Sequence, residues 1–296
     1  MAMAHLALSP ANDVSKGVIA LTIPQRERRR ALVVPREHGA WGMLLVPLAT
    51  GATVGVVSGG RVIPVSLLAT AVLAVFWLRT PLESWLGTGV VRVQTREERH
   101  LVRRFVLPLS AVALVAWSAL LWQGKNQELI WLGMIAGTAF AAQVFLKHRG
   151  RSTRMAAEVI GALALTSTGP AAYSVAIGRL DATARLLWLL NWMFAADQIH
   201  FVWLRIRGAR ASTLSEKLAQ GWSFVLGQIL LIGMLAMARH FKWLPPFTWI
   251  AFAPVLFRGF VWFAKKPQPI EVRRLGWTEM AHAVGFGVLL SFSFVW

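Results

Sequence analysis

Residues 63–86 read IPVSLLATAVLAVFWLRTPLESWL, and this stretch decides the class of fold. Its first 16 residues carry no charge. The whole stretch has the roughly 20 residues with which an α-helix crosses about 30 Å of hydrocarbon. Its two charged residues, Arg79 and Glu83, lie near one end. We therefore predict a transmembrane helix with a polar end.

The composition of the whole chain agrees with this interpretation. Of its 296 residues, 56% are hydrophobic and only 15% are charged, against about 25% in ordinary soluble domains. The absence of cysteine excludes disulfides, cysteine-ligated zinc or iron–sulfur sites and a cysteine nucleophile. The net charge of +18 comes from short basic clusters between apolar stretches. We therefore expect a membrane protein whose partner is the lipid bilayer and not nucleic acid.

Nine apolar stretches follow a basic N-terminal segment. Backbone polar groups in lipid must be satisfied within the segment, which favours helices. We predict an all-α polytopic membrane protein with a cytoplasmic, partly disordered tail at residues 1–37 and a transmembrane domain at residues 38–296. In its longest internal loop, residues 96–99 (REER) are expected to form a solvated helical turn. The nine predicted transmembrane helices cover residues 39–58, 63–86, 105–122, 129–147, 156–177, 184–204, 219–239, 243–263 and 276–296.

The basic residues are distributed asymmetrically. Of the 31 Lys and Arg residues, 23 lie in the tail and in the alternate connections 87–104, 147–155, 205–218 and 264–275, whereas six lie in the other connections. Cytoplasmic loops of membrane proteins carry such an excess. We predict a multi-pass protein of the bacterial cytoplasmic (inner) membrane, with the N-terminus inside and the C-terminus outside.

Ionisable residues within the predicted helices all fall toward the cytoplasmic side. A charge there is costly and marks a candidate functional site. Asn191 and Gln228, in contrast, are expected in the outer half. One-sided clustering is typical of a polar cavity that opens to the cytoplasm. The candidate residues of this cavity are His38, Arg79, Glu83, Glu158, Asp197, His200, Arg258, Glu279 and His282, together with the flanking Arg36, Trp41 and Arg205.

Several of these residues also have a purely structural interpretation. Arg79 and Glu83 are four residues apart and could pair on one helix face. Glu158 could cap its helix and pair with Arg154, four residues earlier. Arg258 could extend to the inner head groups.

Asp197 favours a functional interpretation. It lies more than one turn inside the end of its predicted helix, where Asp is among the most costly residues. His200 follows three residues later on the same face. Glu279 and His282 have the same spacing, but could form an interfacial turn.

Small residues and prolines predict local features of two helices. Gly51 and Gly55 form a small-xxx-small face, which predicts close helix packing. Gly169 and Pro170 predict a break or bend in the fifth transmembrane helix.

These residues together resemble a known family. Residues 35–44 read PREHGAWGML, and HGAW at 38–41 is the most specific part. With RTP at 79–81, DQIH at 197–200 and the segment 276–282, this run resembles the YwiC-like family of bacterial integral membrane proteins. The resemblance covers most of the chain beyond residue 34, and it implies architecture more than a biochemical activity.

A more distant resemblance is to UbiA-type aromatic prenyltransferases, and it implies a nine-helix bundle with a site on the cytoplasmic side. Residues 157–161 (AEVIG), followed by Gly169 and Pro170, look like their fifth helix. Active members hold Mg²⁺ on a prenyl diphosphate through Asp-rich motifs on the second and sixth helices, since Mg²⁺ requires oxygen ligands. Here those positions read FWLRTPLE at 76–83 and DQIHFVWLR at 197–205. We assign no metal-binding residue and do not expect the usual Mg²⁺–diphosphate site.

Two classes of function remain open, and with them whether the chain is an enzyme. The first is a divergent UbiA-like transferase, in which Arg79, Arg205 and Arg258 replace metal in neutralising an anionic head group. Its catalytic acid–base groups would be Asp197, His200 and Glu83.

The second class is a non-enzymatic protein that uses the bundle to bind an isoprenoid, a quinone, haem or another amphiphile, or that serves as a transporter or assembly factor. His38, His200 and His282 are predicted at similar depths on different helices. Three such histidines could ligate a transition metal or haem.

Overall fold

The computed structural model describes residues 24–35, 38–87, 91–124, 127–150, 152–209, 211, 213–265 and 271–296, without the side chains of His38 and Val272. These residues form eleven helices and no strand, which confirms the all-helical fold class. The helices are α1 (Gln25–Val33), α2 (His38–Val57), α3 (Val62–Leu86), α4 (Arg96–Trp122), α5 (Gln127–His148), α6 (Arg154–Thr166), α7 (Thr168–Ile177), α8 (Ala182–Gly208), α9 (Leu214–His240), α10 (Thr248–Ala264) and α11 (Val272–Val295).

Seven helical stretches in the described residues are long and apolar enough to cross a membrane. They comprise α2, α3, α4, α5, α9, α11 and the consecutive pair α6–α7. The remaining two predicted stretches are also helical, as the shorter apolar α10 and the more polar α8. The membrane-type architecture is thus confirmed, and the number of nine crossings stays a prediction.

Large apolar side chains cover the outer surface of these helices. Leu114 and Val115 on α4 and Phe257 on α10 are 66–70% exposed. Contiguous apolar surface of this kind is rare on soluble monomers. It suits a protein whose surroundings are lipid.

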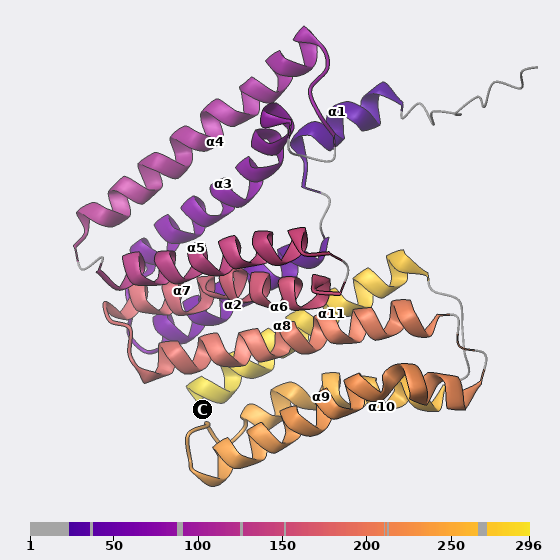
Figure 1. Ribbon diagram of the computed structural model, residues 1–296. Helices are drawn as coiled ribbons and strands as arrows, with labels where there is room; N and C mark the ends of the chain where they lie inside the picture. The colour runs from indigo at the N-terminus through magenta and orange to yellow at the C-terminus, as the bar shows by residue number, and fades with distance from the viewer. Residues whose placement is uncertain are drawn as a thin grey trace, which may run out of the picture.

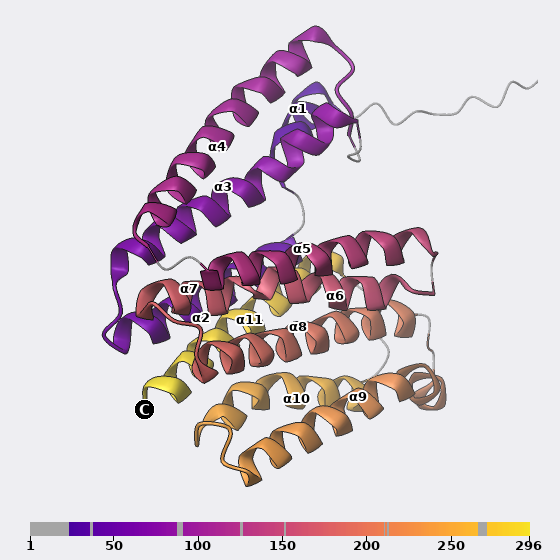
Figure 2. The same cartoon turned by 60° about the vertical axis from the view of Figure 1, so that its left-hand side comes forward.

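The helices form two groups in space. Figures 1 and 2 show α3 and α4 as an antiparallel pair that diverges from the other transmembrane helices. In both views α5, α6 and α7 lie nearest this pair, α8 follows, and α9 with α10 forms the opposite edge. Stacked aromatic rings lie inside the larger group, where Phe194 of α8 and Phe286 of α11 have centroids 4.1 Å apart.

Two predicted local features are confirmed. A Cβ atom added at Gly51 would lie 1.9 Å from the carbonyl oxygen of Gly169, and one at Gly55 would lie 2.7 Å from Cβ of Ala176. The small residues of α2 therefore allow close contact with α7. The predicted break near Gly169 is the boundary at Ser167 between α6 and α7.

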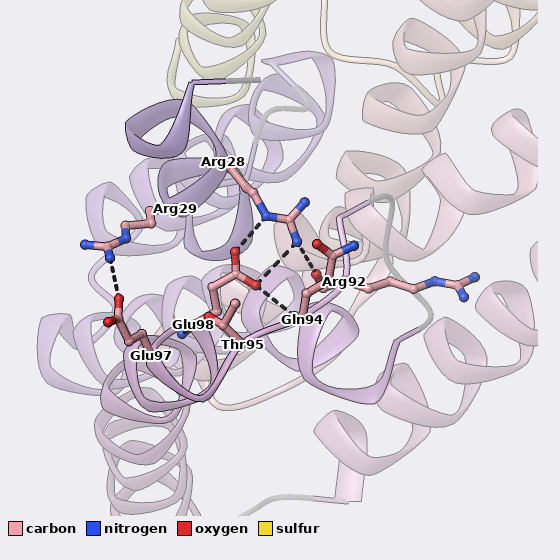
Figure 3. Close-up of polar contacts among 7 residues, drawn as sticks. All are labelled: Arg28, Arg29, Arg92, Gln94, Thr95, Glu97 and Glu98. Atoms are coloured by element: carbon pink, nitrogen blue, oxygen red, sulfur yellow. Dashed lines mark hydrogen bonds and ion pairs between the residues drawn. The ribbon is translucent and has the colours of Figure 1, made fainter. Parts of the chain in front are cut away.

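The prediction of a solvated turn at residues 96–99 is wrong for Glu98. This residue belongs to the first turn of α4 but is only 7% exposed. Figure 3 shows its carboxylate facing Arg28 of α1, whose Nε and Nη2 donate hydrogen bonds of 2.6 and 3.3 Å. The bond to Glu98 also raises the pKa of Arg28 above its ordinary value. Part of the predicted tail is thus a docked helix.

Apolar contacts complete the docking of α1. Leu32 is fully buried and Val33 nearly so, in a cluster with Val102 and Val106 of α4. Nε1 of Trp77 donates a 2.9 Å hydrogen bond to the carbonyl oxygen of Val33. Helix α1 is therefore fixed to both members of the α3–α4 pair. The other predicted tail residues before residue 24 lie outside the described residues.

One end of the molecule carries α1 and the helix ends that flank the connections α3–α4, α5–α6, α8–α9 and α10–α11, which lie on the right in Figure 1. We call it the basic end, because these segments are the ones rich in Lys and Arg. The C-terminus lies at the opposite end. The assignment of the basic end to the cytoplasm stays a prediction.

Candidate functional site

A large groove lies between the two helix groups. Its volume is about 1000 Å³. Helices α2, α3, α5 and α6 supply most of its walls, which are apolar along most of their length. Residues that define the groove are Met43, Val75, Arg79, Gly133, Lys147 and Glu158.

The polar residues of the groove gather where it meets the basic end. The last turns of α3 and α5 bring Arg79, Glu83 and Lys147 there, and the first turns of α6 bring Arg154 and Glu158. These helices run in alternating directions, so residues far apart in the sequence meet at one end. The sequence of each helix explains why the polar residues gather at this end. Each helix is apolar along most of its length and becomes polar only where it approaches a basic connection.

Ion pairs organise this polar end. Nε of Arg79 is 2.8 Å from Oε1 of Glu83, with both side chains 40% exposed. Nε of Arg154 is 3.6 Å from Oε1 of Glu158. Both pairs are separated by four residues on one helix, as their spacing predicted. Both predicted pairs are therefore confirmed, but Glu158 lies in the second turn of α6 and does not cap the helix. All four residues still line the groove.

Among the residues that the structure describes, the polar end carries more positive than negative charge. These residues supply three cations, on Arg79, Lys147 and Arg154, and two carboxylates, on Glu83 and Glu158. Lys147 forms no ion pair with any residue that the structure describes. The end is therefore suited to an anionic group.

A second cluster of charges is buried between α8, α10 and α11. Nη2 of Arg258 donates a 3.0 Å hydrogen bond to Oδ2 of Asp197, and Nη1 donates to Oε2 of Glu279. The three side chains are only 3–9% exposed. Arg258 also stacks over the ring of Phe201, 4.0 Å from its centroid. The alternative that Arg258 extends to the head groups is wrong, because the guanidinium lies inside the bundle.

Two glutamines extend this buried cluster. Nε2 of Gln228 donates to Oδ1 of Asp197, and Nε2 of Gln198 donates a 2.7 Å hydrogen bond to the backbone carbonyl of Glu279. Gln228 therefore lies at the depth of Asp197, so the prediction that these two residues lie in opposite halves of the bundle is wrong. Gln228 lies in the middle of α9, and this central position could have indicated that it lies close to the depth of Asp197. Asn191 bonds instead to Thr50 of α2.

A smaller chamber of about 290 Å³ lies between the groove and this buried cluster. Some residues line the chamber but not the groove, among them Gly42 on α2, Trp203 on α8, and Gly276 and Glu279 on α11. Four residues line both cavities: Gly39, Met43, Glu158 and Ile199. Nε1 of Trp203 donates a 2.7 Å hydrogen bond to Oε2 of Glu158. Sequence analysis missed Trp203, since nothing local marks it as the partner of a residue 45 positions away.

Other predicted residues lie away from both cavities. The ring of His200 faces α9, with Nε2 3.4 Å from Oγ of Ser223. Nδ1 of His282 lies 2.7 Å from the carbonyl oxygen of Thr278 on its own helix. His200 therefore does not join Asp197 at a common cavity.

Trp41 packs on α3, with its ring centroid 4.6 Å from that of Phe76. Arg205 is half-buried, and its charge interacts with that of Glu279. Arg36 and the side chain of His38 lie outside the described residues.

The predicted histidine site for metal or haem stays a prediction, because the side chain of His38 lies outside the described residues. Among the described side chains, no three of His, Cys, Asp or Glu are close enough together to hold a metal ion. The partner of His200 is Ser223 on α9, whereas that of His282 is Thr278 on its own helix α11.

Comparisons with known proteins agree with the resemblance seen in the sequence. The family model for YwiC-like proteins matches residues 34–173. The uncharacterized protein YwiC of Bacillus subtilis (strain 168) is 24% identical over 255 residues, which are 86% of this chain and 95% of that protein. No solved structure matches the chain. The resemblance to the YwiC-like family is thus confirmed, and the resemblance to UbiA-type prenyltransferases stays a prediction.

Proposed function

We propose that this YwiC-like chain binds an anionic amphiphile in the groove between α3 and α5–α6. The observation that carries the proposal is the shape of the groove together with its chemistry. A long apolar cavity ends in a cluster to which the described residues contribute three cations and two carboxylates. An apolar chain would occupy the length, and a phosphate or carboxylate head group would lie at the basic end.

The size of the groove supports a long ligand. Its volume of about 1000 Å³ is at the upper limit of the roughly 300–1,000 Å³ of ordinary small-molecule sites. Helix α3, which diverges with α4 from the other helices (Figure 2), forms one wall of the groove. A lipid or isoprenoid chain is therefore a better fit than a small soluble metabolite.

The polar end supports an anionic head group. The planar guanidinium groups of Arg79 and Arg154 suit phosphate or carboxylate oxygens. Lys147 adds a compact charge that is not neutralised by a described residue. Glu83 and Glu158 hold the two arginines in position through their ion pairs.

Binding is favoured over acid–base catalysis by the surroundings of Asp197. Both of its carboxylate oxygens accept hydrogen bonds, from Gln228 and Arg258. Asp197 lines neither the groove nor the chamber. Of the three predicted catalytic residues, Glu83 alone lines the groove, which supports a role in holding the head group.

The experiment compares two substitutions on α5. A Cβ atom added at Gly133 or Gly137 meets nothing within 4 Å, so either position accepts the start of a side chain, but only Gly133 lines the groove. Native mass spectrometry of the full chain would measure the lipids that co-purify. We expect wild type and Gly137→Phe to retain an anionic amphiphile, and Gly133→Phe to lose at least about nine-tenths of it. Equal retention by the two variants would overturn the proposal.

A further inference from the structure

The wall of the amphiphile groove includes an uncharged polar side chain, Gln143 of α5. Apart from the charged residues of the polar end, the described lining residues are apolar except for Gln143 and Trp117. Gln143 is half-buried, and its amide makes no hydrogen bond with any residue that the structure describes. Neither amide atom is among the fully buried polar atoms without a partner, so both keep accessible surface. The amide therefore has unused donor and acceptor groups.

Gly161 of α6 makes room for this amide. A Cβ atom added at Gly161 would lie within 2.5 Å of Cδ, Nε2 and Oε1 of Gln143. The amide thus lies against the backbone of α6, and both residues line the groove. Any larger residue at position 161 would take the space that the amide occupies. The contact between α5 and α6 therefore fixes a polar group at the wall of the groove.

The depth of Gln143 relates it to the polar end. Lys147 follows four residues later on α5, in the polar end of the same groove. Residues four apart lie on one face of a helix, and the rise of 1.5 Å per residue separates them by about 6 Å along the axis. A ligand with its anionic head group beside Lys147 therefore presents to Gln143 the atoms that lie roughly 6 Å from the charge.

The amide selects what those atoms can be. Its Nε2 donates and its Oε1 accepts, and covering either with hydrocarbon is unfavourable unless a hydrogen bond replaces water. In a polyprenyl phosphate or a fatty acid anion, the atoms at this distance are hydrocarbon. In a glycerophospholipid, the glycerol backbone holds the ester carbonyl groups of the acyl chains at a comparable distance from the phosphate. An ester carbonyl oxygen there accepts a hydrogen bond from Nε2.

We propose that the groove selects anionic glycerophospholipids with ester-linked acyl chains, and that Gln143 is the selecting residue, with Nε2 donating to an ester carbonyl oxygen. This inference rests on the proposed function, because it takes the head group to lie at the polar end, and it narrows the amphiphile to one chemical class. The acyl chain lies along the α5 face that continues from Gln143 through Phe140, Ala136 and Gly133, which also line the groove.

The test compares two lipids that differ only at the ester. Dioleoylphosphatidylglycerol and its dioleyl ether analogue have the same head group and charge, but the ether lacks the carbonyl oxygens. The full chain, purified in detergent, would be titrated with each lipid and followed by native mass spectrometry. We expect the ester lipid to bind about fivefold or more tighter, as one hydrogen bond allows. Equal affinities, or tighter binding of a polyprenyl phosphate than of the ester lipid, would overturn the proposal.

Gln143→Leu tests the amide itself. Leucine removes both polar atoms and keeps the wall apolar, so the preference for ester over ether should fall to within about twofold while the ether lipid still binds. Gln220→Leu is the matched control, because Gln220 on α9 is exposed and lines neither the groove nor the chamber. It should keep the wild-type preference. A full preference in Gln143→Leu would contradict the role of the amide.

Gly161→Ala tests the position of the amide. The added methyl group takes its space, so the ester preference should fall, whereas Gly137→Ala at an open position of α5 should keep it. An unchanged preference in Gly161→Ala would count against the placement of Gln143.

Failure of this inference differs from failure of the proposed function. Equal binding of the two lipids that Gly133→Phe abolishes would refute the selectivity alone. Lipid binding that Gly133→Phe leaves intact would refute the groove as the site, and the selectivity with it.

Discussion

Arg258 of α10 and Asp197 of α8 are joined inside the bundle by a hydrogen bond of 3.0 Å between Nη2 and Oδ2. The side chains are only 9% and 3% exposed, respectively. Removing one partner of a buried pair leaves an uncompensated charge, which typically costs about 3–5 kcal/mol. The pair therefore ties α8 to α10 at a depth where few alternative partners are available.

The first prediction follows from this pair. Asp197→Ala should lower the free energy of unfolding by about 3–5 kcal/mol, measured by denaturant unfolding in detergent. Asp181→Ala is a useful comparison because Asp181 caps α8, with Oδ1 accepting a 3.1 Å hydrogen bond from the backbone of Ala184. Loss of a cap costs only about 1 kcal/mol. Equal losses for the two variants would argue against a buried charge network.

The second prediction concerns the contact of α2 with α7. Gly51→Ala would drive a methyl group into the backbone of Gly169, and neither backbone can move aside cheaply. We expect a loss of at least about 1–3 kcal/mol, as for other overpacked sites. Gly137→Ala, at an open position of α5, should leave stability unchanged. Thermal unfolding of both variants would check this, and a stable Gly51→Ala protein would disprove the close contact.

The third prediction concerns the docking of α1. Arg28→Ala removes the hydrogen bonds to the buried Glu98, so α1 should detach more often. Arg29→Ala removes only an exposed pair with Glu97, and such pairs contribute about 0–1 kcal/mol. Hydrogen exchange of residues 25–33 should therefore accelerate strongly in the first variant and little in the second. Similar exchange in both would mean that apolar contacts alone hold α1.

The fourth prediction concerns Lys217, a lysine on α9 that is only 2% exposed. Its Nζ donates to the carbonyl oxygens of Trp262 and Lys265 at the end of α10 and lies 4.7 Å from the centroid of the Trp262 ring. Lys217→Met leaves those carbonyl groups unpaired, at a cost of about 1–3 kcal/mol. Lys147→Met, at an exposed groove position, should leave the melting temperature unchanged and weaken retention of anionic amphiphiles. If Lys147→Met lowered the melting temperature and Lys217→Met weakened only amphiphile retention, both the structural role of Lys217 and the binding role of Lys147 would be contradicted.

The fifth prediction concerns orientation. The concentration of Lys and Arg at the basic end predicts that this end faces the cytoplasm. Alkaline phosphatase fused after Trp296 should be active, and the same enzyme fused after Arg149 should be inactive. An active fusion after Arg149 with an inactive one after Trp296 would invert the topology.

Features that depend on neighbouring residues along one helix could be predicted from the sequence. The Arg79–Glu83 pair and the close packing at Gly51 and Gly55 are such features, because helix geometry brings residues three or four apart onto one face. The gathering of polar residues at one end also follows from the apolar pattern alone, since each helix becomes polar only near a basic connection.

Features that join distant segments could not be predicted in this way. Glu98 was expected in water because its neighbours are charged, and only the docking of α1 buries it. Gln228 was assigned by its position between apolar residues, whereas its hydrogen bond to Asp197 depends on how α8 and α9 are aligned. The separation of the groove from the Asp197 cluster likewise depends on helix rotation, which periodicity does not specify.

The pairing of Arg28 with Glu98 also has a consequence for synthesis of the chain. The two residues are 70 positions apart, so at translation rates of about 5–20 residues per second Glu98 is made roughly 4–14 s after Arg28. Helices α2 and α3 are synthesised within that interval. The ion pair can therefore close only after the first two membrane segments have been made.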